Sequence, residues 1–131
     1  MMFKDWLEDI RCQVLQGSLE VQVSEVVYDS RKACPGAVFV CMAGSRVDSH
    51  EFCSQVYAAG VRVFVTERPI ALPADATVVM VENGREALAH ISAARFGFPD
   101  RKMVTIGVTG TKGKTTTTHM IKTILEACGK K

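Results

Sequence analysis

The chain has 131 residues and a formal net charge of +2, and 47% of its residues are hydrophobic and 23% charged. This length fits one ordinary domain, or one small domain and the beginning of a second. The composition is that of a globular protein, and it contains neither an apolar run of about eighteen residues nor a signal-peptide pattern. The thinly spread positive charge excludes a nucleic-acid-binding stripe. We therefore expect a cytoplasmic protein whose partners include neither membrane nor nucleic acid.

The five cysteines are odd in number, form no C-x-x-C pair and stand mostly beside apolar neighbours. This pattern favours reduced thiols that pack in the interior over disulfides or a metal site. The cysteines are therefore expected to be structural.

The first sixty residues carry both helical and strand patterns. Residues 3–15 place apolar side chains at spacings of three and four, which predicts a helix. Residues 20–28 alternate as a strand does, and the continuous apolar run 37–43 is typical of a strand covered on both faces. A second helix is predicted over residues 50–59, where Gly60 ends it.

Two short β-branched runs follow, at residues 61–65 and 77–81, and both predict strands. Residues 83–96 then have a helical pattern that ends before Pro99-Asp100. The succession of strand, helix and strand predicts a small α/β domain with a mixed or parallel sheet.

A new unit begins after Pro99-Asp100. Residues 104–108 read as a buried strand, a glycine-rich loop follows, and residues 115–127 predict an amphipathic helix. One strand and one helix cannot form a complete sheet domain, because the strand edge would stay open. We therefore expect a fragment of a longer protein, with a first domain at 1–82 and the incomplete start of a second at 83–131.

The glycine-rich loop has the properties of a phosphate-binding loop. Its residues are Gly110, Thr111, Lys112, Gly113, Lys114, Thr115 and Thr116. Glycines at 107, 110 and 113 permit positive φ angles and let backbone N–H groups approach a polyphosphate closely. Lys114 supplies positive charge for the β- and γ-phosphates, Thr115 offers a hydroxyl to Mg²⁺, and the following helix points its positive end at the anion.

The strict phosphate-loop pattern would have glycine at position 108, where this chain has Val108. The alternative is a plain turn that joins a strand to a helix. Gly-Lys-Thr at the start of a predicted helix, directly after a predicted strand, favours the phosphate loop. A nucleoside triphosphate with Mg²⁺ is thus the expected ligand.

Two separate parts of the chain resemble the Mur ligases. The loop from Val108 to Thr117 resembles the ATP loop of that family. The upstream matches to its amino-terminal domain are Tyr28-Asp29-Ser30-Arg31, Pro35-Gly36-Ala37-Val38-Phe39-Val40, Gly44, Asp48-Ser49-His50-Glu51-Phe52 and Ala58-Ala59-Gly60-Val61. The resemblance implies an α/β fold in which a small mixed-sheet UDP-substrate domain precedes the first strand–P-loop–helix unit of a truncated ATP-binding domain.

The resemblance also implies a reaction. Mur ligases make peptidoglycan precursor by phosphorylating the carboxylate of a UDP-N-acetylmuramyl-peptide and letting an amine displace the phosphate. The pattern here is most similar to the member that adds the third residue, diaminopimelate or lysine, to UDP-N-acetylmuramoyl-L-alanyl-D-glutamate, and a monomer is expected. Two alternatives remain: the member that adds the terminal dipeptide, and a UDP-sugar- or nucleotide-binding module without catalysis.

Site residues follow from the same resemblance. Tyr28, Ser30 and the loop Ser45, Arg46 and Val47 stand at positions that contact the UDP-muramyl substrate. Taken without the family, Asp29-Ser30-Arg31 reads as a turn with a local hydrogen bond and a solvated arginine. His50 reads as a helix-start or packing residue.

Lys114 is the one residue in this chain expected to be catalytic, through its charge on the γ-phosphate. The remaining catalytic groups would lie downstream, so the 131 residues alone are expected to be inactive. Two positions depart from the family pattern: Ser49 replaces a common glycine, and Lys112 replaces a common asparagine. With lysine at position 112 the loop also resembles the ATP loop of the folylpolyglutamate synthetases, which lack the first domain seen here.

Overall fold

The structure is a computed structural model that describes residues 1–45 and 47–130. The chain forms two compact units, Met1–Pro99 and Asp100–Lys131. None of the helices in these described stretches has the length and apolar character needed to cross a bilayer.

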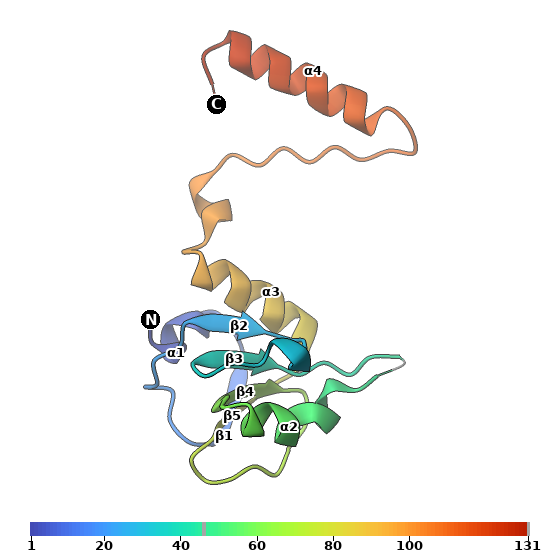
Figure 1. Ribbon diagram of the computed structural model, residues 1–131. Coiled ribbons are helices and arrows are strands. Elements are labelled where there is room, and N and C mark those ends of the chain that lie inside the picture. Colours follow the sequence, from blue (N-terminus) through green and yellow to red (C-terminus); the bar gives the residue numbers. More distant parts are fainter. Residues whose placement is uncertain (46, 131) are drawn as a thin grey trace. The chain divides into compact units, whose positions relative to one another are not determined.

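The first unit contains a five-stranded mixed sheet (Figure 1). Its strands are β1 (Cys12–Gln16), β2 (Glu25–Val27), β3 (Ala37–Val40), β4 (Val63–Thr66) and β5 (Thr77–Val81), in the order β1-β5-β4-β3-β2. The pairs β2–β3, β3–β4 and β4–β5 are parallel, and β1 is antiparallel to β5. The predicted small α/β domain with a mixed sheet is confirmed.

Helices cover both faces of this sheet. Figure 1 shows α3 (Gly84–Arg95) and α2 (Cys53–Ala58) on opposite sides of it. Val38 and Val40 of β3 pack into the core on the α3 side, whereas Phe39 between them packs into the core on the α2 side. All four residues of β3 are buried, which confirms the strand covered on both faces that its apolar run predicts.

The helix predicted over residues 3–15 is wrong beyond its first turn. Helix α1 spans only Phe3–Trp6, the backbone turns at Asp9 with φ of +69°, and the chain continues as β1. Residues 12–16 pair with β5, and the backbone hydrogen bonds between the two strands favour the extended conformation over a helix. Val14, in the middle of this strand, is 43% exposed. The apolar spacing therefore reflects two different environments, a buried α1 and a half-exposed edge strand.

The other predicted elements of this unit are present with different bounds. The strand expected at 20–28 is limited to β2, and the helix expected at 50–59 begins as a 3₁₀ helix, Ser49–Phe52, before α2. Gly60 ends that helix with φ of +100°. Helix α3 begins after Asn83, whose side-chain oxygen accepts the N–H groups of Arg85 and Glu86.

The compact first unit extends to Pro99, whereas the sequence placed a boundary after residue 82. The physical reason is α3, which buries Ala87, Ile91 and Ala94 in the same core as Val38 and Val40. Separating α3 from the sheet would expose this apolar surface to water.

A 3₁₀ helix, Pro99–Lys102, begins at the last residue of the first unit, and the second unit contains α4 (Lys114–Ala127). Helix α4 confirms the helix predicted after the glycine-rich loop. The strand predicted at 104–108 is not formed: this segment has no strand assignment, and Val104 is 94% exposed. A strand needs a ladder partner, and the described residues pair none with this segment.

Candidate functional site

The parallel strands β2, β3, β4 and β5 end at one edge of the sheet, because parallel strands share a direction. Tyr28 directly follows β2, and the loop 43–48 follows β3, the neighbouring strand. Two segments that are separate in sequence and were both predicted to bind substrate therefore both follow strands that end at the carboxyl edge. Open α/β sheets bind ligands at this edge.

A hollow of about 390 Å³ lies beside the end of β2. It is lined by Glu25, Val26, Val27, Tyr28, Asp29, Lys32 and Cys34. Tyr28 is 59% exposed, so its ring is accessible for stacking on a flat ligand group. The hollow also offers the Lys32 ammonium group as a charged donor.

Asp29 caps the 3₁₀ helix Ser30–Lys32 by accepting the Arg31 backbone N–H at 3.0 Å. Its carboxylate also accepts from Arg31 Nε at 2.9 Å and Nη2 at 2.7 Å. These bonds lower the pKa of Asp29 to about 2, and the side-chain hydrogen bonds from Arg31 contribute more to this shift than the backbone N–H does. Asp29 is therefore anionic at neutral pH and engaged with Arg31, as the alternative reading of a local turn predicts. The substrate contact predicted for Ser30 stays a prediction.

The loop after β3 folds back tightly on itself. The Gly44 N–H donates to the Val47 carbonyl at 3.1 Å, and Ala43 forms an isolated antiparallel bridge with Asp48. A side chain at Gly44 would collide with the Val47 carbonyl. Ser45 and Val47 are exposed at the tip. The predicted contact Arg46 lies outside the described residues.

His50 is buried beneath this loop, where its side chain is 2% exposed. Its Nε2 accepts the backbone N–H of Glu67 at 3.0 Å, so Nδ1 must carry the ring proton when the ring is neutral. Nδ1 lies 2.5 Å from Asp48 Oδ1, to which it can donate. Asp48 also accepts the His50 backbone N–H, and it pairs with Arg68 at 2.7 Å. His50 is thus a packing residue, as predicted, with two specific polar partners.

Sequence reasoning missed Glu67, the residue directly after β4. The signal was available in part, because an acidic residue follows the buried apolar strand β4 at the edge where ligands bind. Its partners, however, are the backbone groups of Ala43 and Gly84, which belong to distant parts of the chain. Only the strand order brings these groups together.

In the second unit, the glycine-rich loop leads directly into α4. Gly110 and Gly113 have φ of +148° and +76°, which favour glycine, whereas Gly107 is not among the positive-φ residues. The positive φ expected at 107 is therefore wrong. Lys114 begins α4 and its Nζ donates to the Gly110 carbonyl at 2.5 Å. Among the described residues no side chain caps the first turn of α4, so the N–H groups of that turn can receive an anion.

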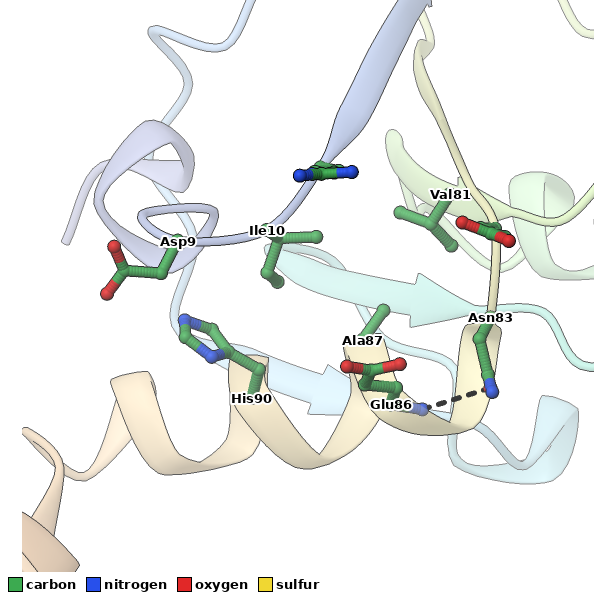
Figure 2. Close-up of a pocket in the computed structure, with 9 residues that line it drawn as sticks. Asp9, Ile10, Val81, Asn83, Glu86, Ala87 and His90 are labelled. Atoms are coloured by element: carbon green, nitrogen blue, oxygen red, sulfur yellow. Dashed lines mark hydrogen bonds between the residues drawn. The ribbon is translucent and has the colours of Figure 1, made fainter.

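A second hollow, of about 260 Å³, lies where β5 passes into α3 (Figure 2). Its lining includes Asp9, Glu86 and His90, and it contains none of the predicted site residues. The described residues contain no group of three or more His, Cys, Asp or Glu side chains that could hold a metal ion.

Comparison with known proteins adds a family. The description "Mur ligase family, catalytic domain" belongs to a sequence profile that matches residues 22–96 of this chain. These residues run from just before β2 to just after α3, and so contain the whole parallel part of the sheet.

Two proteins of similar sequence are named as ligases. The chain is 37% identical over 129 residues to the UDP-N-acetylmuramoyl-L-alanyl-D-glutamate–2,6-diaminopimelate ligase of Clostridium perfringens. The aligned region is 98% of this chain and 27% of that protein. It is 44% identical over 110 residues to the ligase of the same name from Bacillus cereus, and this aligned region is 84% of this chain and 22% of that protein. The chain thus spans about a quarter of the length of these relatives.

Solved structures have the same fold. A crystal structure of MurF from Acinetobacter baumannii matches 96% of this chain and 27% of its own with a TM-score of 0.71 and 30% identity. MurF ligase from Thermotoga maritima in complex with ADP matches 80% of this chain and 24% of its own with a TM-score of 0.57 and 27% identity.

Proposed function

The chain belongs to the Mur ligase family, and from this premise we propose that it is part of an ATP-dependent ligase that adds diaminopimelate to UDP-N-acetylmuramoyl-L-alanyl-D-glutamate. The observation that carries the proposal is that Tyr28 and the loop 43–48 follow neighbouring parallel strands that end at one sheet edge, in a chain whose relatives are named for this reaction. Those names favour diaminopimelate over lysine as the added residue. In this proposal the 131 residues supply the substrate grip and the phosphate loop, and they are inactive alone.

The related ligase that adds the terminal dipeptide is the nearest alternative. The two solved structures described above are of MurF, at 30% and 27% identity, whereas the two diaminopimelate ligases reach 37% and 44%. The sequence similarity therefore favours the diaminopimelate ligase.

In this proposal the carboxyl edge of the sheet holds the UDP end of the substrate. The exposed Tyr28 ring would stack on the uracil, and Ser30, Ser45 and Val47 would meet the nucleotide from two sides. Hydroxyl and backbone N–H donors suit uracil and diphosphate oxygens. Arg46 is proposed as a further donor to the diphosphate.

The loop 110–116 would hold the phosphates of ATP, and bound ATP would supply the phosphoryl group that activates the carboxylate. The open first turn of α4 and the two positive-φ glycines fit such an anion. Lys114 would turn its ammonium group from the Gly110 carbonyl to the γ-phosphate and offset negative charge there. The Thr115 hydroxyl would face Mg²⁺.

Calorimetric titration of the chain with UDP-N-acetylmuramoyl-L-alanyl-D-glutamate tests the substrate grip. Wild-type protein should bind saturably and UDP should compete. Ser30→Ala should weaken binding about tenfold, because one hydrogen bond to a charged or polar group contributes about 1–2 kcal/mol. Ser54→Ala makes the same change at an exposed position of α2 and should bind like wild type.

Absence of binding by a folded wild-type chain would contradict the proposed substrate. Equal weakening by both serine variants would contradict a specific role for Ser30.

A further inference from the structure

Glu67 joins the ends of three neighbouring parallel strands. It directly follows β4, and its Oε2 accepts the backbone N–H of Ala43 at 2.9 Å, in the loop after β3. Its Oε1 accepts the backbone N–H of Gly84 at 2.7 Å, at the start of α3 after β5. One carboxylate therefore connects segments that are 24 and 17 residues away along the chain.

The backbone of Glu67 makes a third connection. Its N–H donates to His50 Nε2, and His50 in turn contacts Asp48. Ala43 and Asp48 are the two ends of the loop 43–48 and bridge to each other. Both ends of the loop are therefore tied to Glu67, one through its carboxylate and the other through its backbone N–H and His50.

The chemistry of this junction requires a carboxylate. Two N–H donors point at it from different directions, and both bonds are strengthened by the negative charge. Gly84 is the first residue of α3, so the positive end of that helix also stabilises the anion. A side chain on Gly84 would collide with the Cys41 carbonyl and would lie 3.0 Å from Glu67 Oε1, so the close approach depends on glycine.

Few apolar side chains of the loop 43–48 are buried against the rest of the unit. Ala43, Gly44, Ser45 and Val47 are all exposed, in contrast to the buried β3 that precedes them. An exposed segment without buried side chains relies on its hydrogen bonds for a defined conformation. The bond from Ala43 to Glu67 fixes the first residue of the loop to the segment after β4, and the ion pair between Asp48 and Arg68 joins the last residue of the loop to the same segment.

We propose that Glu67 is a positioning residue for UDP-sugar binding. It holds the described loop residues 43–45 and 47–48 in the conformation that presents Ser45 and Val47 to the nucleotide, and it contacts no ligand itself. This inference rests on the proposed function, because it assumes that the loop binds the UDP end of the substrate.

Glu67→Gln tests the role with almost no change in size. One end of the glutamine amide can accept an N–H, but its NH₂ group then faces the other backbone N–H, donor against donor. We expect binding of UDP-N-acetylmuramoyl-L-alanyl-D-glutamate to weaken at least tenfold. Glu82→Gln removes the same charge at an exposed position after β5 and should change affinity less than twofold.

Amide hydrogen exchange in the absence of ligand provides the readout that general destabilisation would not give. In Glu67→Gln at least one of the amides of Ala43 and Gly84, the one that faces the NH₂ group, should exchange at least tenfold faster. The amides of Val40 and Val65, within the sheet, should keep their wild-type rates. A uniform acceleration across the sheet would mean that Glu67 only stabilises the fold and would overturn its positioning role.

The outcomes separate the two proposals. If wild type binds and Glu67→Gln binds equally well, the inference fails and the proposed function stands. If folded wild type does not bind at all, the proposed function fails and the role of Glu67 fails with it. If Glu67→Gln does not fold, Glu67→Asp replaces it: this side chain keeps the charge but is too short to reach both N–H groups, and the same tenfold criterion applies.

Discussion

Asp48 is held in its charged form by the groups around it. The backbone N–H and the side chain of His50 donate to its carboxylate, and Arg68 lies beside it, so its pKa falls below the ordinary value of 3.8. A carboxyl group with a lowered pKa in the folded state adds stability above its unfolded pKa, and this stability is lost as the pH falls through the folded pKa. Asp48 therefore makes the first unit sensitive to acid below about pH 4.

Asp48→Asn should remove part of this acid sensitivity. We expect it to lower the free energy of unfolding by about 1 kcal/mol at pH 7, through lost charge-assisted hydrogen bonds, and to flatten the decline between about pH 4 and pH 2. Urea unfolding followed by the fluorescence of Trp6 measures this, because Trp6 is the single tryptophan and is buried in the first unit. Asp100→Asn makes the same charge change in the other unit. An unchanged pH slope in Asp48→Asn would contradict the role of Asp48.

At the scale of elements, the burial of α3 predicts a large effect of shortening its core side chains. Ile91 is 0% exposed and packs with strand residues such as Val38 and Val40. Ile91→Ala should lower the free energy of unfolding of the first unit by about 2–5 kcal/mol, because it leaves a cavity. Ile124→Ala on α4, where the side chain is 62% exposed, should leave the Trp6 unfolding midpoint unchanged. A small effect of Ile91→Ala would mean that α3 is not part of this core.

Elements with a strong local pattern could be predicted from the sequence, and those that depend on distant partners could not. The apolar run of β3 and the capped start of α3 at Asn83 specify their structures locally. By contrast, β1 exists because β5 lies beside it, and its apolar spacing looks helical when read alone. The segment 104–108 has the composition of a strand, yet it has no ladder partner among the described residues.

The candidate site also contains residues that the sequence could predict and one that it could not. Tyr28 and the loop 43–48 could be found because short motifs mark them, and the order of the parallel strands brings them together. Glu67 carries no motif, because its function depends on two backbone N–H groups that only the folded sheet places near it. Side chains that bind backbone groups across a sheet leave little trace in one sequence.

At the scale of the whole molecule, the two units should separate the two halves of the proposed chemistry. The first unit carries the proposed UDP site at the sheet edge, and the second carries the phosphate loop. A change confined to the phosphate loop should therefore affect ATP use and leave both the fold of the first unit and its grip on the UDP-sugar unaltered.

Lys114→Ala tests this separation. In the full-length ligase we expect turnover to fall at least about a hundredfold to a thousandfold, because a fixed positive charge that stabilises the transferring phosphoryl group is lost. Calorimetric affinity for UDP-N-acetylmuramoyl-L-alanyl-D-glutamate and the Trp6 unfolding midpoint should match wild type. Lys122→Ala removes an equivalent charge from the exposed middle of α4 and should retain activity. Near-normal turnover in Lys114→Ala would remove its catalytic assignment, whereas a parallel loss of UDP-sugar affinity would show that the two units do not bind their ligands independently.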